Sequence, residues 1–245
     1  MKIKQHIPNF ITSLNLASGL ISITLVLTGD LLWSAFFIFL AAVFDFLDGT
    51  AARLLKAHSE FGKQLDSLAD LVSFGVAPGL IMFQLISANC AGSCNVLDRM
   101  QITPYFALLI PVCSAFRLAK FNIDLRQEVN FIGLPTPANA LFFASIPLVL
   151  LLQPQLFSLI KLEFMTDFFS NTRMLAALSV FFSYLMISEF RIFSMKFKTL
   201  EWKGNQVRYL FLILSLALMM VFSLSAIPLV IVLYLVLSLF FQRMF

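Results

Sequence analysis

Long apolar runs separated by short polar breaks occupy almost the whole chain. Gly29-Asp30 separates the first two runs, and Ser225 to Pro228 separates the last two. A helix needs about 20 mostly apolar residues to cross a bilayer, and the runs approach that length. The pattern therefore predicts an all-α integral membrane protein with about eight transmembrane helices, near residues 9–28, 31–56, 62–87, 104–122, 136–153, 172–190, 207–224 and 226–243.

Composition supports a membrane protein over a soluble one. Of 245 residues, 60% are hydrophobic, 12% are charged and 29 are Phe, whereas soluble domains carry about 25% charged residues. We see no internal repeat and no soluble domain, so we expect one transmembrane domain over residues 1–245. The run from Ile7 to Leu27 is too long for the core of a signal peptide, and we expect it to stay as the first helix.

The distribution of positive charge predicts an orientation. With eight spans, fourteen of the 17 Lys and Arg residues fall on the side of the two termini, and only Arg99, Lys161 and Arg173 fall on the other. Cytoplasmic segments are enriched in Lys and Arg, so we expect a cell-membrane protein with both termini inside the cell. The net charge of +4 then reflects orientation, and no motif indicates a nucleic-acid partner.

The three cysteines leave the redox chemistry open. Cys113 falls in a predicted helix, where we expect it to pack. Cys90 and Cys94 share one predicted outside loop, where a disulfide is as reasonable as two free thiols. A zinc site would need two more ligands, and His6 and His58 fall on the opposite side.

Four aspartates lie close together between apolar runs. Asp45 and Asp48 are three residues apart, and Asp66 and Asp70 are four apart, so each pair shares one helix face. Carboxylates in this number suit Mg²⁺ or Mn²⁺ and could hold two ions that clamp phosphate oxygens. Taken singly, Asp48-Gly49 could end a helix and Arg53 could be an interface residue. Together, they predict a phosphate-handling metal site at the cytoplasmic ends of two helices.

Glycine and arginine residues beside the aspartates support this interpretation. Gly49 and Gly62 would leave room for a bulky ligand near the backbone. Arg53 lies one turn after Gly49 and could bind a phosphate through two nitrogens.

The spacing of these residues resembles a known family. Asp45 to Asp70 follow D-x2-D-G-x2-A-R-x8-G-x3-D-x3-D, the signature of the CDP-alcohol phosphotransferases. The resemblance implies a six-helix core, a divalent-metal site at the cytoplasmic interface, and transfer of a phosphatidyl group from a CDP-linked lipid to an alcohol, with release of CMP.

The resemblance also implies a role for each matching residue. Asp45, Asp48 and Asp66 would bind one metal ion, and Asp45, Asp66 and Asp70 a second. Asp70 would also be the catalytic general base. The CDP moiety would contact Gly49, Arg53 and Ser59. Relatives form homodimers, so we expect the same here.

Further segments resemble the phosphatidylserine synthase branch of that family. They are I-P-N-F-I-T-S-L-N-L-A-S-G from Ile7, S-L-A-D-L-V-S-F-G from Ser67, R-L-A-K-F-N from Arg117 and F-I-G-L-P-T-P-A from Phe131. CDP-diacylglycerol and L-serine would then be the substrates. For the serine pocket we consider Arg117 and Lys120 as partners of the carboxylate, with Asn122, Ser67 and Ser73 as further polar contacts. Arg117 could contact the lipid phosphate instead of serine. Asn9, Thr12 and Asn15 share one face of the first helix, and the resemblance favours Asn9 and Thr12 in the nucleotide pocket.

Three other functions remain open at this point. A sister enzyme could use glycerol 3-phosphate, inositol phosphate or choline as the acceptor. An intramembrane prenyltransferase also binds magnesium pyrophosphate through paired aspartates, but it lacks the D-G-x2-A-R arrangement. A transporter could use buried carboxylates, although the later part of the chain shows no equivalent cluster.

Overall fold

The computed structural model describes residues 3–57, 59–90, 102–124, 131–152, 163–192 and 205–241. Its elements, in chain order, are α1 (Ile3–Leu27), α2 (Leu31–Leu54), α3 (Glu60–Asp70), the π-helical segment η1 (Leu71–Val76), α4 (Ala77–Cys90), the 3-10 segment η2 (Thr103–Leu108), α6 (Leu109–Ile123), β1 (Phe131–Ile132), α7 (Thr136–Leu152), α8 (Glu163–Ser170), α9 (Thr172–Ile187), β2 (Arg191–Ile192), α10 (Gln206–Phe222), η4 (Ser223–Ser225) and α11 (Ala226–Phe240).

The predicted all-α membrane fold is confirmed, and each of the eight predicted helices has a counterpart. Within the described part of the chain, five stretches are long and apolar enough to cross a membrane. One of them, Gln206–Phe240, contains α10 and α11, which turn back on each other at Ser223, where φ is +53°. Two shorter apolar helices, α7 and α9, complete the set. The chain is therefore a multi-pass membrane protein.

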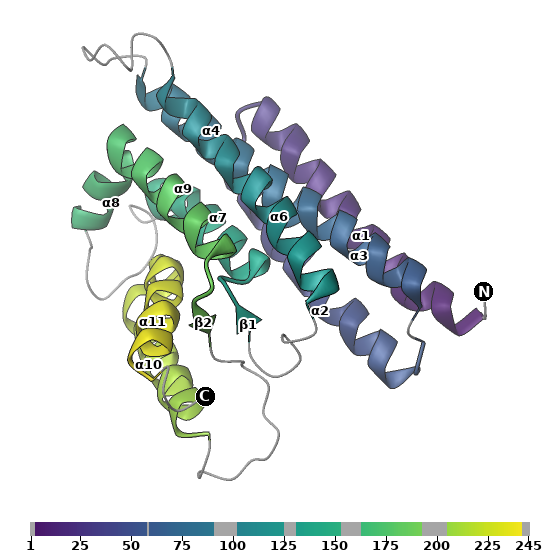
Figure 1. The fold of residues 1–245 in the computed structure, drawn as a ribbon. Helices are drawn as coiled ribbons and strands as arrows, with labels where there is room; N and C mark the ends of the chain where they lie inside the picture. Colours follow the sequence, from purple (N-terminus) through teal and green to yellow (C-terminus); the bar gives the residue numbers. More distant parts are fainter. Residues whose placement is uncertain are drawn as a thin grey trace.

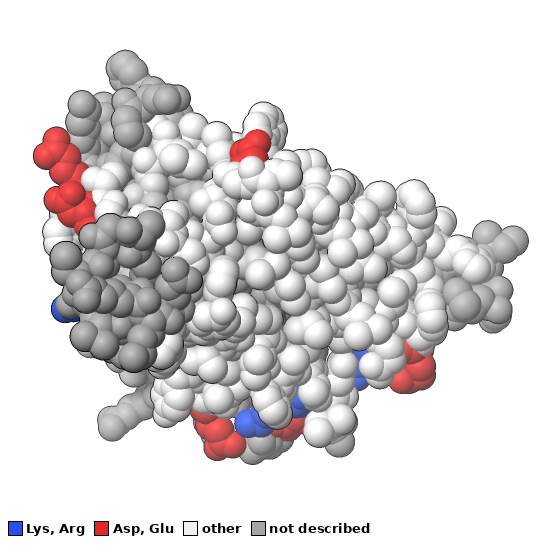
Figure 2. All heavy atoms as spheres, turned by 90° about the horizontal axis from the view of Figure 1, so that it is seen from above, with Lys and Arg blue, Asp and Glu red and all other residues white. Residues whose placement is uncertain are grey.

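The helices form two neighbouring groups. In Figure 1, α1, α2, α3, α4 and α6 run together along one side, and α7 and α9 join them to the α10–α11 hairpin. Most of the described surface in Figure 2 carries no charged side chain, and the coloured atoms lie near its edges. An uncharged surface of this kind is suited to contact with lipid.

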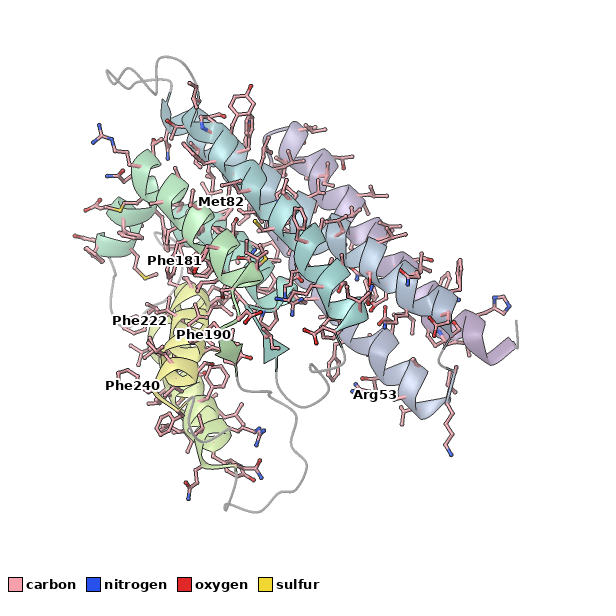
Figure 3. The ribbon with its side chains drawn as sticks, in the orientation of Figure 1. Arg53, Met82, Phe181, Phe190, Phe222 and Phe240 are labelled. Atoms are coloured by element: carbon pink, nitrogen blue, oxygen red, sulfur yellow. The ribbon has the colours of Figure 1, made fainter. Side chains whose placement is uncertain are left out.

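Two hydrophobic clusters hold these groups together. The first joins α4, α6, α7, α9 and α11 around aromatic rings, and the rings of Phe142 and Phe182 stack with centroids 4.1 Å apart. Met82, on α4, belongs to this cluster (Figure 3). The second joins α1, α2, α4 and α7 around Ile38, Phe74 and Ile81. Cys113 packs against the first cluster, as predicted.

Several details differ from the prediction. The first helix begins at Ile3 rather than near residue 9, and α8 was not expected. The predicted helix 62–87 is interrupted by η1. Two strands of two residues each, β1 and β2, pair antiparallel and tie the segment after α6 to the segment after α9. Cys94 and the side chain of Cys90 lie outside the described residues, so the disulfide question stays open.

Candidate metal and nucleotide site

Three of the four aspartates converge where α2 meets α3. Asp45 and Asp48 lie on α2 and Asp66 lies on α3, and one carboxylate oxygen from each lies within 4.8 Å of the others. Asp48 is buried, and the other two are partly buried. The three- and four-residue spacings thus place the carboxylates on facing helix surfaces, as the sequence predicts.

The chemistry of this cluster fits a divalent cation. Oδ2 of Asp48 and Oδ1 of Asp66 are buried without a hydrogen-bond partner. No Lys or Arg among the described residues forms an ion pair with Asp45, Asp48 or Asp66. Grouped carboxylates with unpaired oxygens repel one another unless a cation lies between them. Oxygen-rich sites of this type bind hard divalent ions.

Asp70 lies beside this group and is not part of it. It ends α3 one turn after Asp66, is 8% exposed, and its Oδ1 accepts a hydrogen bond of 3.1 Å from Nδ2 of Asn15 on α1. It remains within electrostatic range of Asp45 and Asp66. Asn15 therefore fixes the orientation of Asp70, a contact between α1 and α3 that sequence spacing did not suggest.

The π-helical segment η1 begins directly after Asp70. Its Ser73 donates a hydrogen bond of 3.0 Å to the carbonyl oxygen of Asn15. At Gly75, an added Cβ would lie 3.0 Å from Cβ of Ser114 on α6. Small residues therefore let η1 approach both α1 and α6, and π-helical turns often occur at functional sites.

A cavity of about 700 Å³ opens next to the aspartates, between α1, α2 and α3. Asp48 and Asp66 line this cavity. So do all five residues that were predicted to contact the CDP moiety, which are Asn9, Thr12, Gly49, Arg53 and Ser59. Arg53 is exposed at the C-terminal end of α2 (Figure 3), and its Nη2 donates to Thr50 Oγ1 at 3.3 Å. The structure thus brings the five predicted CDP contacts together around one cavity, although they are up to 50 positions apart in the sequence.

The two glycines of the signature have different surroundings. A Cβ at Gly49 would meet nothing within 4 Å, so this position does leave room beside the backbone. A Cβ at Gly62 would lie 2.9 Å from Oδ1 of Asn9 and 3.0 Å from Oγ of Ser59. Gly62 also lines the cavity, but Asn9 and Ser59 already occupy the space that a side chain at this position would need.

Ser59 has a local structural task as well. Its Oγ accepts a hydrogen bond of 3.0 Å from the backbone N–H of Gly62 and so caps the N-terminus of α3. A serine cap satisfies a backbone donor that the helix leaves unpaired. The cap sets where α3 begins, and therefore where Asp66 lies along the cavity.

The residues considered for a serine pocket are dispersed. Ser73 is fully buried against α1. Asn122 donates to Ser67 Oγ at 2.8 Å, and Lys120 pairs with Glu189 at 3.6 Å. None of these four lines the 700 Å³ cavity.

Arg117 is the candidate with the closest relation to the aspartates. It is 7% exposed, lies within electrostatic range of Asp70, and donates from Nη1 to Thr136 Oγ1 on α7 at 2.7 Å. Its Nε has no hydrogen-bond partner.

Three polar residues on α7 and α11, Thr136, Asn139 and Tyr234, have no role in the sequence-based prediction. Thr136 and Asn139 lie one turn apart on α7, and both are fully buried. Tyr234 on α11 lies within electrostatic range of Arg117. Thr136 and Asn139 had a visible signal, since they are polar residues at helical spacing in an apolar run. Tyr234 had none, because its proximity depends on how α11 packs.

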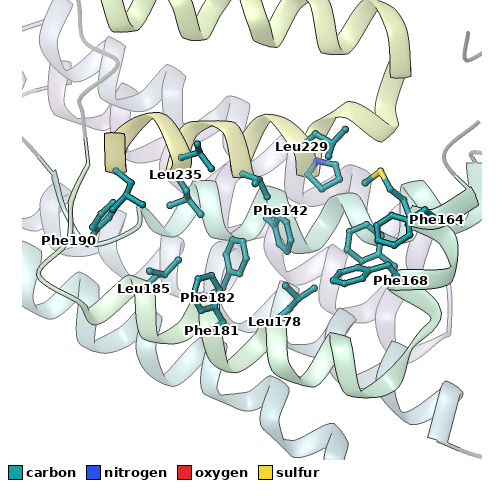
Figure 4. A pocket seen from close by; sticks show the side chains of 16 residues that line it. Phe142, Phe164, Phe168, Leu178, Phe181, Phe182, Leu185, Phe190, Leu229 and Leu235 are labelled. Carbon is teal, nitrogen blue, oxygen red and sulfur yellow. The ribbon is translucent and has the colours of Figure 1, made fainter. Parts of the chain in front are cut away.

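A second cavity of about 600 Å³ lies between α7, α8, α9 and α11. Figure 4 shows Phe142, Phe168, Phe182 and Leu229 pointing toward one another across it. Its lining contains no titratable side chain, so phosphoryl chemistry belongs to the cavity beside the aspartates.

Comparison with known proteins supports the same region as the functional one. The family model for CDP-alcohol phosphatidyltransferase matches residues 5–184. A CDP-diacylglycerol–serine O-phosphatidyltransferase of Bacillus subtilis is 34% identical over 191 residues, covering 76% of this chain and 89% of that protein. One of Helicobacter pylori strain 26695 is 29% identical, covering 94% of this chain and 87% of that protein.

A third relative differs in the lipid that its name implies. An archaetidylserine synthase of Methanothermobacter thermautotrophicus is 35% identical over 142 residues, covering 57% of this chain and 56% of that protein. The matched residues 5–184 contain all four aspartates, the cavity beside them and Arg117. The chain belongs to the CDP-alcohol phosphatidyltransferase family.

Proposed function

We propose that the chain transfers the phosphatidyl group of CDP-diacylglycerol to the hydroxyl of L-serine, giving phosphatidylserine and CMP. The observation that carries this proposal is the cavity beside the aspartates. Its lining combines Asp48 and Asp66 with Asn9, Gly49 and Arg53. The names of the three relatives support serine as acceptor, and two of those names specify CDP-diacylglycerol as donor.

The donor binds in this cavity. Gly49 leaves open space beside α2 for the nucleotide, and Asn9 and Thr12 offer polar atoms from α1. Arg53, at the cavity rim, binds phosphate oxygens, because a guanidinium matches their geometry and charge. The diacylglycerol chains extend into the surrounding lipid.

Two Mg²⁺ or Mn²⁺ ions are the cofactors that we propose. Asp45, Asp48 and Asp66 would hold the first, and Asp45, Asp66 and Asp70 would hold the second. Bound there, the metal would neutralise the pyrophosphate charge and stabilise the charge that develops on its oxygens.

Asp70 acts as the general base. The hydroxyl oxygen of serine forms a bond to the phosphorus that carries diacylglycerol, and the bond from that phosphorus to the CMP phosphate breaks. CMP takes the electron pair, and the hydroxyl proton passes to the Asp70 carboxylate. Asn15 supports this role by holding Asp70 through a hydrogen bond of 3.1 Å. A positioned base of this kind typically contributes 10²–10⁴-fold.

Arg117 binds the serine carboxylate. It is buried, its Nε has no protein partner, and it lies within electrostatic range of Asp70. Lys120, Asn122, Ser67 and Ser73 have protein partners, and their contact with serine stays a prediction.

The site faces the cytoplasm in this proposal, because fourteen of the 17 Lys and Arg residues belong to the side of the termini. The homodimer and the single-domain boundaries stay predictions, since the structure contains one chain.

The test is CMP release by purified protein in vesicles that contain CDP-diacylglycerol. L-Serine, glycerol 3-phosphate, inositol phosphate and choline are supplied separately with Mg²⁺ or Mn²⁺, and the lipid product is identified by mass. We expect release with L-serine and a product with the mass of phosphatidylserine. Release with glycerol 3-phosphate and none with L-serine would refute the acceptor assignment.

A further inference from the structure

The α6–α7 polar cluster, defined as Arg117, Thr136 and Asn139, contains more hydrogen-bonding capacity than the protein uses. Asn139 is fully buried, yet neither its Oδ1 nor its Nδ2 has a hydrogen-bond partner. Nε of Arg117 is also buried without a partner. Buried polar groups are nearly always paired, because an unpaired one loses its hydration and gains nothing. The cluster therefore has the properties of a binding site.

The cluster is continuous with the proposed catalytic base. Arg117 lies within electrostatic range of Asp70 and donates to Thr136. Asn139 follows Thr136 by one turn, so the two side chains share a face of α7. The η1 segment, which begins right after Asp70, also packs against α7.

We propose that Asn139 is a specificity-determining residue that binds the acceptor, with its Oδ1 accepting a hydrogen bond from the acceptor's ammonium group. This inference rests on the proposed function. A zwitterionic amino alcohol offers a carboxylate for the unpaired Nε of Arg117 and an ammonium for the unpaired Oδ1 of Asn139. Its hydroxyl then lies toward Asp70. The ligand thus supplies a partner to two of the three atoms that the protein leaves unpaired, Nε of Arg117 and Oδ1 of Asn139.

The test compares Asn139→Leu with wild type, because leucine keeps the volume and removes both amide atoms. We expect the KM for L-serine to rise at least tenfold, while the KM for CDP-diacylglycerol changes less than twofold. Asn139→Ala is the second variant, in case leucine disturbs folding. Ser183→Ala is the matched control: Ser183 is also a buried polar residue on an apolar helix, it lies beside Cys113 and outside the proposed site, and its loss should leave both KM values unchanged.

A pair of acceptors separates binding from a structural role. L-Serine is compared with 3-hydroxypropanoate, which keeps the carboxylate and hydroxyl and lacks the ammonium group. We expect Asn139→Leu to reduce the preference of kcat/KM for L-serine over 3-hydroxypropanoate at least tenfold. An equal fall for both acceptors, or a parallel rise in the KM for the lipid, would overturn the inference, since a packing defect acts on every substrate.

The wild-type control distinguishes the two proposals. If wild type ignores L-serine and uses another acceptor, the proposed function fails. The same variants are then measured with that acceptor. A rise confined to its KM would keep Asn139 in the acceptor site, and no rise would overturn the inference as well.

Discussion

At the scale of single residues, the site contains three carboxylates that lie close together and a fourth that lies beside them. Asp45, Asp48 and Asp66 converge within 4.8 Å, whereas Asp70 is engaged by Asn15. In the proposal, Asp45, Asp48 and Asp66 would serve as metal ligands alone, whereas Asp70 would both hold the second ion and act as the base. The two roles lead to different expectations for the same Asp→Asn substitution.

Replacement of Asp45 or Asp66 by Asn should remove the metal site. We expect activity to fall by roughly 10³-fold or more. Each of the two aspartates would contribute to both proposed metal ions, and the neutral amide of Asn cannot balance their positive charge. A chelator should do the same to wild type, and Mg²⁺ or Mn²⁺ should restore activity. Asp30→Asn is the control: Asp30 caps α2 by accepting from the N–H of Trp33, and Asn caps equally well. Full activity in metal-free buffer would refute the metal proposal.

Replacement of Asp70 by Asn should act on the chemical step. An amide cannot take up the hydroxyl proton, so we expect kcat to fall by about 10²–10⁴-fold. Asp45, Asp48 and Asp66 would still supply metal ligands, the amide oxygen still accepts the hydrogen bond from Asn15, and Asp70 does not line the donor cavity, so CDP-diacylglycerol binding should stay within about twofold, measured by equilibrium binding. Loss of lipid binding in proportion to kcat would instead indicate that Asp70 is chiefly a ligand of the donor site.

At the scale of elements, close packing of α1, α2 and α3 forms the cavity. Gly62 allows α3 to approach Asn9 on α1, and Ser59 caps α3 at the same point. At Gly49, in contrast, an added Cβ would meet nothing within 4 Å. Of the two signature glycines, Gly62 therefore serves helix packing and Gly49 leaves space for the ligand.

Alanine at each glycine should reveal this separation. Gly62→Ala places a Cβ 2.9 Å from Oδ1 of Asn9, and we expect destabilisation of about 1–3 kcal/mol from overpacking. Gly49→Ala lies inside α2 with open space around it, so it should stabilise the helix by about 0.5–1 kcal/mol.

The KM for CDP-diacylglycerol should nevertheless rise in Gly49→Ala, because the methyl group enters the nucleotide space. Thermal unfolding in detergent, with the KM measured alongside, checks both variants. A destabilised Gly49→Ala with unchanged KM would contradict this division of roles.

At the scale of the whole molecule, charge distribution and fold together define two ends of the helix bundle. α8 and the start of α3 lie at opposite ends in Figure 1. The aspartates belong to the end at which α2 and α3 meet. If the charge asymmetry sets orientation, the active site opens toward the side where a water-soluble acceptor such as serine is made.

Single cysteines can test that orientation. In a chain with Cys90, Cys94 and Cys113 replaced by serine, Glu163→Cys on α8 should react with a membrane-impermeant maleimide added to intact cells. Glu60→Cys at the start of α3 should react only after permeabilisation, because positive-inside charge places that end in the cytoplasm. CMP release serves as the control for correct folding. The reverse labelling pattern would refute the proposed orientation.

The sequence by itself determined the helices and the signature of the site. Apolar run length predicts a spanning helix, and spacings of three and four residues predict a shared helix face, because both depend on local geometry. The same spacings predict all four aspartates together, and the structure places Asp45, Asp48 and Asp66 in one group with Asp70 beside it. The five expected nucleotide contacts also line one cavity, although their contact with CDP stays a prediction.

Only the tertiary structure decided how distant segments meet. The π-helical η1, the β1–β2 pair, the bond from Asn15 to Asp70 and the approach of Tyr234 to Arg117 all join residues far apart or depend on packing against another helix. The same packing fills the space at Gly62 and leaves Asn139 unpaired. Local periodicity carries no information on these contacts, because they depend on which helix faces are buried against each other.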